Sequence, residues 1–195
     1  MTAMYIVALG GIEEDILAAI EQGLARVYGS TVRRMPGLPE PDYAYDVQRG
    51  QHSSAHILRQ LIGRVPKDAV SMLGITQRDL FIPMLSFVLG QAQLGGPASV
   101  VSLARLHQDF YGLPPDRLLV LTRAVKEAVH EVGHTVGLTH CADSTCPMSL
   151  SNTVRQVDAK GTALCANCIT LLEEQTTKHA RFVRTASQGA GTGKG

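Results

Sequence analysis

The chain has 195 residues, of which 45% are hydrophobic and 18% are charged, with a formal net charge of +1. A chain this long buries roughly 70% of the surface that its unfolded form exposes, so its core needs neither disulfides nor metal to form. Near-neutral charge, without any lysine- or arginine-rich block, argues against nucleic-acid binding through bulk charge. No apolar run approaches the ~20 residues that span a membrane, and residues 1–12 lack a basic leader, so we expect a cytoplasmic protein that does not bind membranes.

The first hundred residues predict strands that alternate with helices. We expect a strand over residues 5–9, an amphipathic helix over 13–28, a short strand over 30–34 and a proline-rich loop over 35–46. A second helix, capped by Ser53 or Ser54, is expected over 53–64, followed by strands over 69–75, 86–94 and 98–103. This alternation is typical of an α/β fold with a mixed, mostly parallel twisted sheet and backing helices.

The rest of the chain predicts a long helix followed by an irregular region. The helix is expected over residues 116–137, after Pro114 and Pro115, and a last helix over 166–183 follows the polar, turn-rich residues 141–164. We therefore predict three parts: an α/β subdomain over 1–140 that ends in the long helix, a small cysteine-rich subdomain over 141–185 that ends in a helix, and a glycine-rich flexible tail over 186–195.

The long predicted helix carries a metal-binding pattern. His130 and His134 lie one turn apart on one helix face, so both rings can bind the same zinc ion. Gly137 can adopt the left-handed conformation that stops a helix, which lets His140 return as a third ligand. Three histidines leave one position for water and substrate, which favours a catalytic site. Glu131 is placed to take a proton from zinc-bound water and to deliver it to the leaving amine.

All four cysteines lie after residue 140, in two pairs. Cys141 and Cys146 form one pair, and Cys165 and Cys168 form the other. This spacing fits a tetrahedral structural zinc site, which would tie the irregular region to the last helix. Two disulfides, four unrelated thiols, or a redox pair at 165 and 168 are the alternatives, and a cytosolic location disfavours disulfides. Because neighbouring side chains in an extended segment point apart, His140 and Cys141 should serve different metals, giving two zinc ions per chain.

Met148 lies eight residues after His140, within the sequence Cys-Pro-Met-Ser. Here the sequence resembles the metzincin metallopeptidases, in which a methionine turn lies beneath the zinc. With the four cysteines included, the pattern over residues 130–168 resembles the archaemetzincin family; residues 79–81 and 86–92 are also similar to that family, less specifically. The resemblance implies a metzincin-like α+β fold, with Met148 packed under the catalytic zinc without binding it.

The resemblance also implies how substrate binds. In metzincins a peptide lies extended along an edge strand above the zinc, and that strand is predicted here within residues 86–92. We expect the peptide to contact four residues of it: Phe87, Val88, Leu89 and Gly90. The expected function is a monomeric zinc-dependent peptidase, with the resemblance suggesting aminopeptidase-like cleavage of short peptides. The alternative is a zinc-stabilised peptide-binding module with a relict peptidase site. Glu131 argues against this alternative, because peptide or metal binding alone does not need a glutamate at that position.

Overall fold

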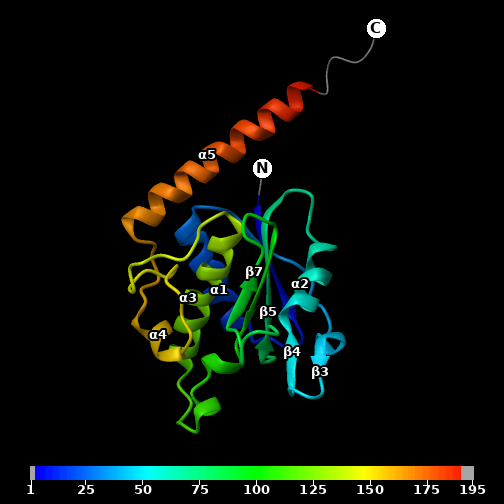
Figure 1. Ribbon diagram of the computed structural model, residues 1–195, viewed down its shortest axis with the longest axis vertical. Helices are drawn as coiled ribbons and strands as arrows, with labels where there is room; N and C mark the ends of the chain where they lie inside the picture. Colours follow the sequence, from blue (N-terminus) through cyan, green and yellow to red (C-terminus); the bar gives the residue numbers. More distant parts are fainter. Residues whose placement is uncertain (1–2, 190–195) are drawn as a thin grey trace.

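The computed structural model describes residues 3–189, and a five-stranded sheet forms its centre (Figure 1). The strand order is β2-β1-β5-β8-β7, and only β7 runs antiparallel to its neighbour. The mostly parallel sheet predicted from the sequence is therefore confirmed. The strands are β1 (Ala3–Leu9), β2 (Val32–Arg34), β5 (Ala69–Thr76), β7 (Gly90–Ala92) and β8 (Ala98–Ser102).

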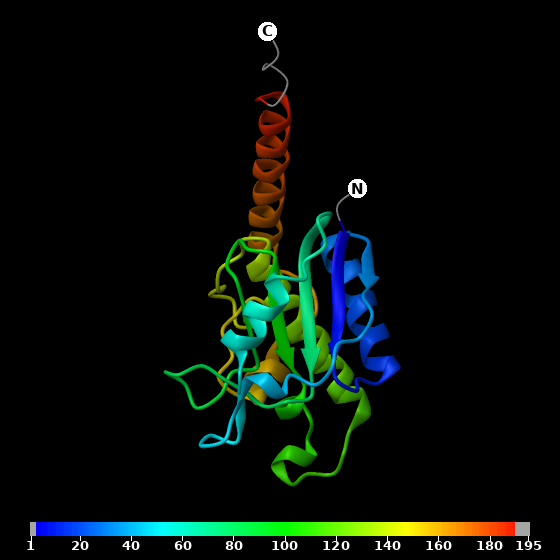
Figure 2. The ribbon, with the colours of Figure 1, turned by 90° about the vertical axis from the view of Figure 1, so that its right-hand side faces the viewer.

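Helices cover both faces of this sheet. Figure 2 shows α1 (Glu14–Tyr28) and α2 (Ser54–Ile62) on opposite sides of it, and α3 (Arg117–Thr135) packs beside α1. Successive strand residues point to opposite faces, so neighbours such as Ile6 and Val7 belong to different apolar clusters. The cluster under α1 and α3 is continuous with the region that contains the histidines and cysteines.

A second, smaller sheet was missed by the sequence analysis. It consists of β3 (Tyr45–Asp46), β4 (Gln51–Ser53) and β6 (Leu80–Phe81), in the order β3-β4-β6. The predicted loop over 35–46 thus contains a 3-10 turn, Asp42–Ala44, and a strand. Two- and three-residue strands lack the alternating pattern that makes longer strands recognisable, so sequence reasoning could not identify them.

The strand predicted over residues 86–94 was too long. Only Gly90–Ala92 forms β7, because the preceding residues leave the main sheet: Val88 donates its N–H to Leu80 of β6 at 2.9 Å. Val88 and Leu89 pack into two different apolar clusters, and from sequence alone such an apolar run cannot be distinguished from a single buried strand.

The C-terminal part differs from the prediction in two respects. A short helix, α4 (Val154–Ala159), interrupts the region predicted to be irregular; its capping box, Thr153 with Gln156, is a local sequence signal for the start of this helix. The last helix, α5 (Ala166–Gly189), continues through the first four residues assigned to the flexible tail and projects from the body (Figure 1). Residues 190–195 lie outside the described residues.

The division of the chain into subdomains at residue 140 stays a prediction. Residues on both sides of this position pack into the same apolar cluster. Two further 3-10 turns, Ala104–Leu106 and Asp109–Tyr111, connect β8 to α3. Among the described residues, none of the helices is both long and apolar enough to cross a membrane.

Candidate active site and metal centres

Three histidine rings meet at the end of α3. His130 and His134 lie one turn apart on the helix, and His140 follows the helix and returns toward them. The ring centroids are 4.6 Å apart for His130 and His134, 5.3 Å for His130 and His140, and 4.9 Å for His134 and His140. One ring nitrogen of each histidine lies within 4.8 Å of one nitrogen of each of the others, so the three histidines could hold a metal ion.

Backbone carbonyls fix the orientation of the two helical histidines. His130 Nδ1 donates to the Pro147 carbonyl and His134 Nδ1 to the Leu138 carbonyl, both at 2.8 Å. Burial lowers the pKa of His130 to about 3 and also lowers the pKa of His134 and of His140, which keeps the rings neutral. The Nε2 lone pairs of His130 and His134 therefore face each other at 3.1 Å.

That arrangement fits a zinc ion. Facing lone pairs repel unless a cation lies between them, and carbonyl bonds at Nδ1 are the usual support for a ring that binds metal through Nε2. Tetrahedral zinc with nitrogen ligands at ~2.0–2.1 Å separates neighbouring nitrogens by about 3.3 Å, close to the 3.1 Å observed. Three protein ligands would leave one position open for water and substrate.

The turn after α3 brings His140 back. The helix ends at Thr135, and Gly137 has a φ of +93°, which side-chain-bearing residues rarely adopt. Leu138 N then donates to the Gly133 carbonyl at 2.9 Å, closing the turn. The chain therefore reverses within a few residues, and His140 reaches the two rings that the helix carries.

Met148 packs against the helix that carries His130 and His134. Its side chain is fully buried against the helix, and a Cβ atom built on Gly133 would lie 2.9 Å from Met148 Cε and closer still to the sulfur. The Met148 carbonyl accepts the N–H of Cys141 at 2.9 Å, which ties the methionine to the residue after His140. Gly133 is thus required by close packing, a role that the sequence analysis did not recognise.

Glu131 lies between the helix and the edge strand. Its side chain is buried against β7 so closely that a Cβ atom on Gly90 would lie 2.6 Å from the Glu131 carboxyl carbon. Burial raises the pKa of Glu131 well above its ordinary value, the neighbouring Glu127 raises it further, and Lys160 opposes both. Such a carboxyl group exchanges protons more readily near neutral pH than an exposed glutamate does.

Glu127 and Lys160 form a buried ion pair that the sequence analysis missed. Lys160 Nζ lies 3.3 Å from Glu127 Oε1, and the two side chains are 0% and 3% exposed. Burial raises the pKa of Glu127, while Lys160 lowers it. Glu127 precedes Glu131 by one helical turn, so the spacing could have placed both carboxylates on one face. Lys160 is distant in sequence and had no local signal.

A cleft of about 520 Å³ opens over the histidines. The four predicted substrate contacts, Phe87, Val88, Leu89 and Gly90, all line it, together with Glu127 and Glu131 of α3. The segment after Met148 contributes the remaining wall through Leu150, Ser151 and Asn152. The structure therefore brings the histidines, Glu131 and the predicted edge strand to one cavity.

The four cysteines form a second, separate cluster. Cys141 Sγ lies 3.7 Å from Cys165 Sγ, and Cys146 Sγ lies 3.7 Å from Cys168 Sγ. A disulfide needs ~2.05 Å, whereas thiolates on tetrahedral zinc at ~2.3 Å are separated by about 3.8 Å. The sulfur atoms all lie within 4.8 Å of one another, so the cluster fits a structural zinc site. His140 and the adjacent Cys141 belong to different clusters.

Comparisons with known proteins agree with this geometry. A sequence model of Peptidase family M54 matches residues 41–174. The archaemetzincin of Methanocaldococcus jannaschii is 38% identical over 167 residues, which cover 86% of this chain and 90% of that protein. The crystal structure of the archaemetzincin of Methanopyrus kandleri matches with a TM-score of 0.79 at 36% identity, covering 90% of this chain and 96% of the other.

A third match is a zinc-dependent peptidase from Methanocorpusculum labreanum, with a TM-score of 0.81 at 25% identity, covering 87% of this chain and all of the other. The family match spans the histidines, the cysteines and the edge strand alike. The relatives align over nearly their whole length, so the similarity is not confined to the metal-binding motif. The chain therefore belongs to the archaemetzincins, Peptidase family M54, and is a zinc metallopeptidase.

Proposed function

We propose that this chain hydrolyses short peptides, with Glu131 as the proton carrier and with two zinc ions per chain. The observation that carries the proposal is the position of Glu131, whose carboxyl group lies between the histidine-bearing helix and the Gly90 backbone of the edge strand. A peptide paired with that strand would present its carbonyl groups beside both Glu131 and the three histidines.

His130, His134 and His140 would hold the catalytic zinc, and the four cysteines would hold the structural one. When bound, the catalytic ion would supply Lewis-acid chemistry: it polarises a carbonyl group and lowers the pKa of water to about 7. Glu131 takes the proton of the attacking water and delivers it to the amine of the departing product. Its raised pKa suits both transfers, since the group must accept the proton and release it again within one turnover.

Substrate would pair with the outer side of β7. Leu89 O and Gln93 N bond to β8, and in an antiparallel pair alternate residues direct both backbone groups toward the partner strand. Gly90 and Ala92 therefore direct their N–H and C=O groups outward, toward the cleft. Main-chain pairing of this kind supplies affinity without regard to the substrate's sequence.

The shortness of β7 supports a preference for short peptides. Two outward-facing residues offer four backbone groups, enough to hold a peptide of a few residues in extended form. An aminopeptidase-like action follows if the substrate's N-terminus lies close to the metal site. Peptides that differ only in N-terminal acetylation test this point, because an aminopeptidase loses activity on the blocked form whereas an endopeptidase does not.

The decisive experiment is a peptide-library digest with wild type and with Glu131→Gln, a substitution of nearly equal size. We expect two zinc ions per chain in both proteins, because Glu131 is not a ligand, and cleavage by the wild type alone, with a loss of at least about 10²-fold. Two zinc ions with no cleavage that depends on Glu131 would instead favour a peptide-binding module with a relict site.

A further inference from the structure

Residues 82–87, the first part of the connection between β6 and β7, form a loop at one rim of the cleft. These residues lie outside the helices and strands, so their conformation depends on contacts with the rest of the molecule. The last three of them line the cavity over the histidines: Leu85, Ser86 and Phe87. Whatever fixes this loop therefore also fixes a surface that substrate must contact.

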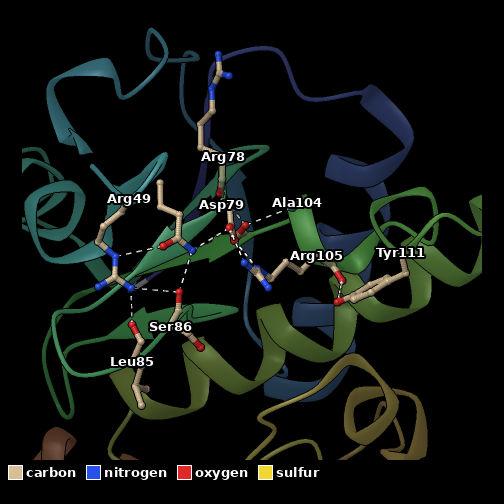
Figure 3. Close-up of polar contacts among 10 residues, drawn as sticks. Arg49, Arg78, Asp79, Leu85, Ser86, Ala104, Arg105 and Tyr111 are labelled. Carbon is tan, nitrogen blue, oxygen red and sulfur yellow. Dashed lines mark hydrogen bonds and ion pairs between the residues drawn. The ribbon is translucent and has the colours of Figure 1, made fainter. Parts of the chain in front are cut away.

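Asp79 lies at the centre of a polar network beside this loop (Figure 3). Arg105 donates from Nε and Nη2 to the two carboxylate oxygens, at 2.7 and 2.8 Å, and Gln51 Nε2 donates to Asp79 Oδ2 at 2.9 Å. The side chains of Arg105 and Asp79 are 21% and 18% exposed. A bidentate, partly buried pair of this kind fixes the plane and direction of both groups.

Two arms of the network reach the loop. Gln51 Nε2, bonded to Asp79, also donates to the Ser86 carbonyl at 3.0 Å, and the Arg105 guanidinium lies 4.0 Å from the centroid of the Phe87 ring. Arg49 adds bonds to the carbonyls of Leu85, at 2.7 Å, and of Ser86, at 3.2 Å. Figure 3 shows the Arg49 side chain reaching Leu85 and Ser86 of this loop.

The surface held in this way is apolar. Leu85 is 49% exposed and Leu150, from the segment after Met148, is 54% exposed, and both line the cleft with Phe87. Exposed apolar side chains inside a cleft are typical of a surface that binds an apolar ligand group. The matching substrate is a peptide with a large apolar side chain at the position that meets this wall.

We propose that Asp79 is a positioning residue that, through Arg105 and Gln51, holds the loop 82–87 as an apolar specificity wall for peptide substrates. This inference rests on the proposed function. Asp79 acts on binding and not on the chemistry, because its partners end at the loop and do not include Glu131 or the histidines. A released loop must be ordered anew each time a peptide binds, which weakens binding and leaves the bound complex equally reactive.

The first test compares Asp79→Asn with a matched control, Glu40→Gln, which breaks the neighbouring ion pair between Arg78 and Glu40 at 2.9 Å. The probes are two hexapeptides that differ only in one leucine or serine. For the leucine peptide we expect Asp79→Asn to raise KM about tenfold with kcat within about twofold. The serine peptide should change less, and the control should match wild type for both peptides.

Hydrogen exchange supplies a readout on the loop itself. In Asp79→Asn the amides of residues 82–88 should exchange at least about tenfold faster, while those of β1 keep their wild-type rates. If Asp79→Asn does not fold, Arg105→Lys, which keeps the charge but loses the bidentate fork, replaces it in both measurements. Unchanged exchange, unchanged KM or an equal loss in kcat would each overturn the proposal.

Failure of the proposed function gives a different result. If wild type and Glu131→Gln are equally inactive, binding of the leucine hexapeptide is measured instead, with Glu131→Gln alone and combined with Asp79→Asn. A Kd about tenfold higher in the double variant supports the positioning role of Asp79 even then. Equal Kd values would refute it.

Discussion

The part of the chain up to Leu138 and the segment 141–164 are stabilised by different interactions. The first part buries apolar side chains on both faces of a sheet. The second contributes only five buried apolar or sulfur-containing side chains from its 24 residues: Cys146, Pro147, Met148, Val157 and Leu164. Its other attachments are the paired cysteines and ionic contacts. The sheet region is therefore stabilised by its own apolar core, whereas the segment 141–164 would depend on the zinc proposed for the four cysteines.

Helix α3 is shared by the two regions. One side of it packs on the sheet, while Arg123 binds Asp158 of α4 through two bonds of 2.7 Å. Lys126 Nζ donates to the carbonyls of Val157 and Asp158 at 3.1 and 3.0 Å. The histidine cluster lies at this junction, since two of its members come from the helix and Met148, which packs against that helix, comes from the segment.

The largest expected effect is that of Cys146→Ser, which removes one of the four thiols. Structural zinc sites contribute ~10–16 kcal/mol to the folding of small zinc domains, so the variant should retain at most one zinc per chain and lose order in residues 141–164. Because Cys141 N bonds to the Met148 carbonyl, His140 should loosen as well and peptidase activity should fall. Metal analysis, hydrogen exchange and a peptide digest measure the three effects.

The sheet should remain folded in this variant, with wild-type exchange in β1 and β5. Full activity in Cys146→Ser with one zinc per chain would show that the two metal sites are independent. Unfolding of the whole chain would show that the sheet also depends on the structural metal, and would contradict the comparison.

Lys160→Met should cost about 3–5 kcal/mol, because it leaves the buried Glu127 carboxylate without its counter-ion. Urea unfolding followed by circular dichroism measures the loss. Arg33→Gln is the control: it breaks an ion pair with Asp68 in which both side chains are nearly half exposed, and it should leave stability unchanged. If the two substitutions lowered the free energy of unfolding by similar amounts, the buried ion pair of the C-terminal segment would be no more stabilising than an exposed one.

Gly133→Ala tests the packing between the two regions. Alanine favours a helix over glycine by up to ~1 kcal/mol, but here the new methyl group would meet Met148. We therefore expect a net loss of about 1–3 kcal/mol from overpacking. The double variant with Met148→Ala should be more stable than the sum of the losses in the two single variants predicts. If Gly133→Ala were instead more stable than wild type, Met148 would have to move aside without cost.

The smallest effect is expected for Ile75→Val in β5, a fully buried position of the sheet. Removing one methylene group should cost about 0.5–1.5 kcal/mol. Zinc content and the exchange of residues 141–164 should stay at wild-type values, because the change lies in the part that needs no metal. Loss of zinc here would link the sheet to the metal-dependent segment more tightly than we expect.

The predictable parts of the fold were those with long, periodic segments. Helices α1 and α3 and strand β5 follow their apolar spacing closely, and Ser53 and Asp116 accept the capping bonds of α2 and α3. The errors concern short elements. The small sheet is built from strands of two or three residues, and β7 is short because Val88 pairs with Leu80, a partner that no local pattern indicates.

The identity and grouping of the candidate ligands could be read from the amino-acid sequence, because one helical turn, one glycine turn and two cysteine pairs are local features with fixed geometry. The side chains that surround these ligands depend on tertiary packing. Gly90 lies against Glu131, Met148 lies under Gly133, Lys160 reaches Glu127, and Asp79 reaches the cleft loop through Arg105 and Gln51. These contacts join residues that are far apart in the chain. They form because folding brings distant segments against α3 and β7, and no local sequence pattern relates those segments to one another.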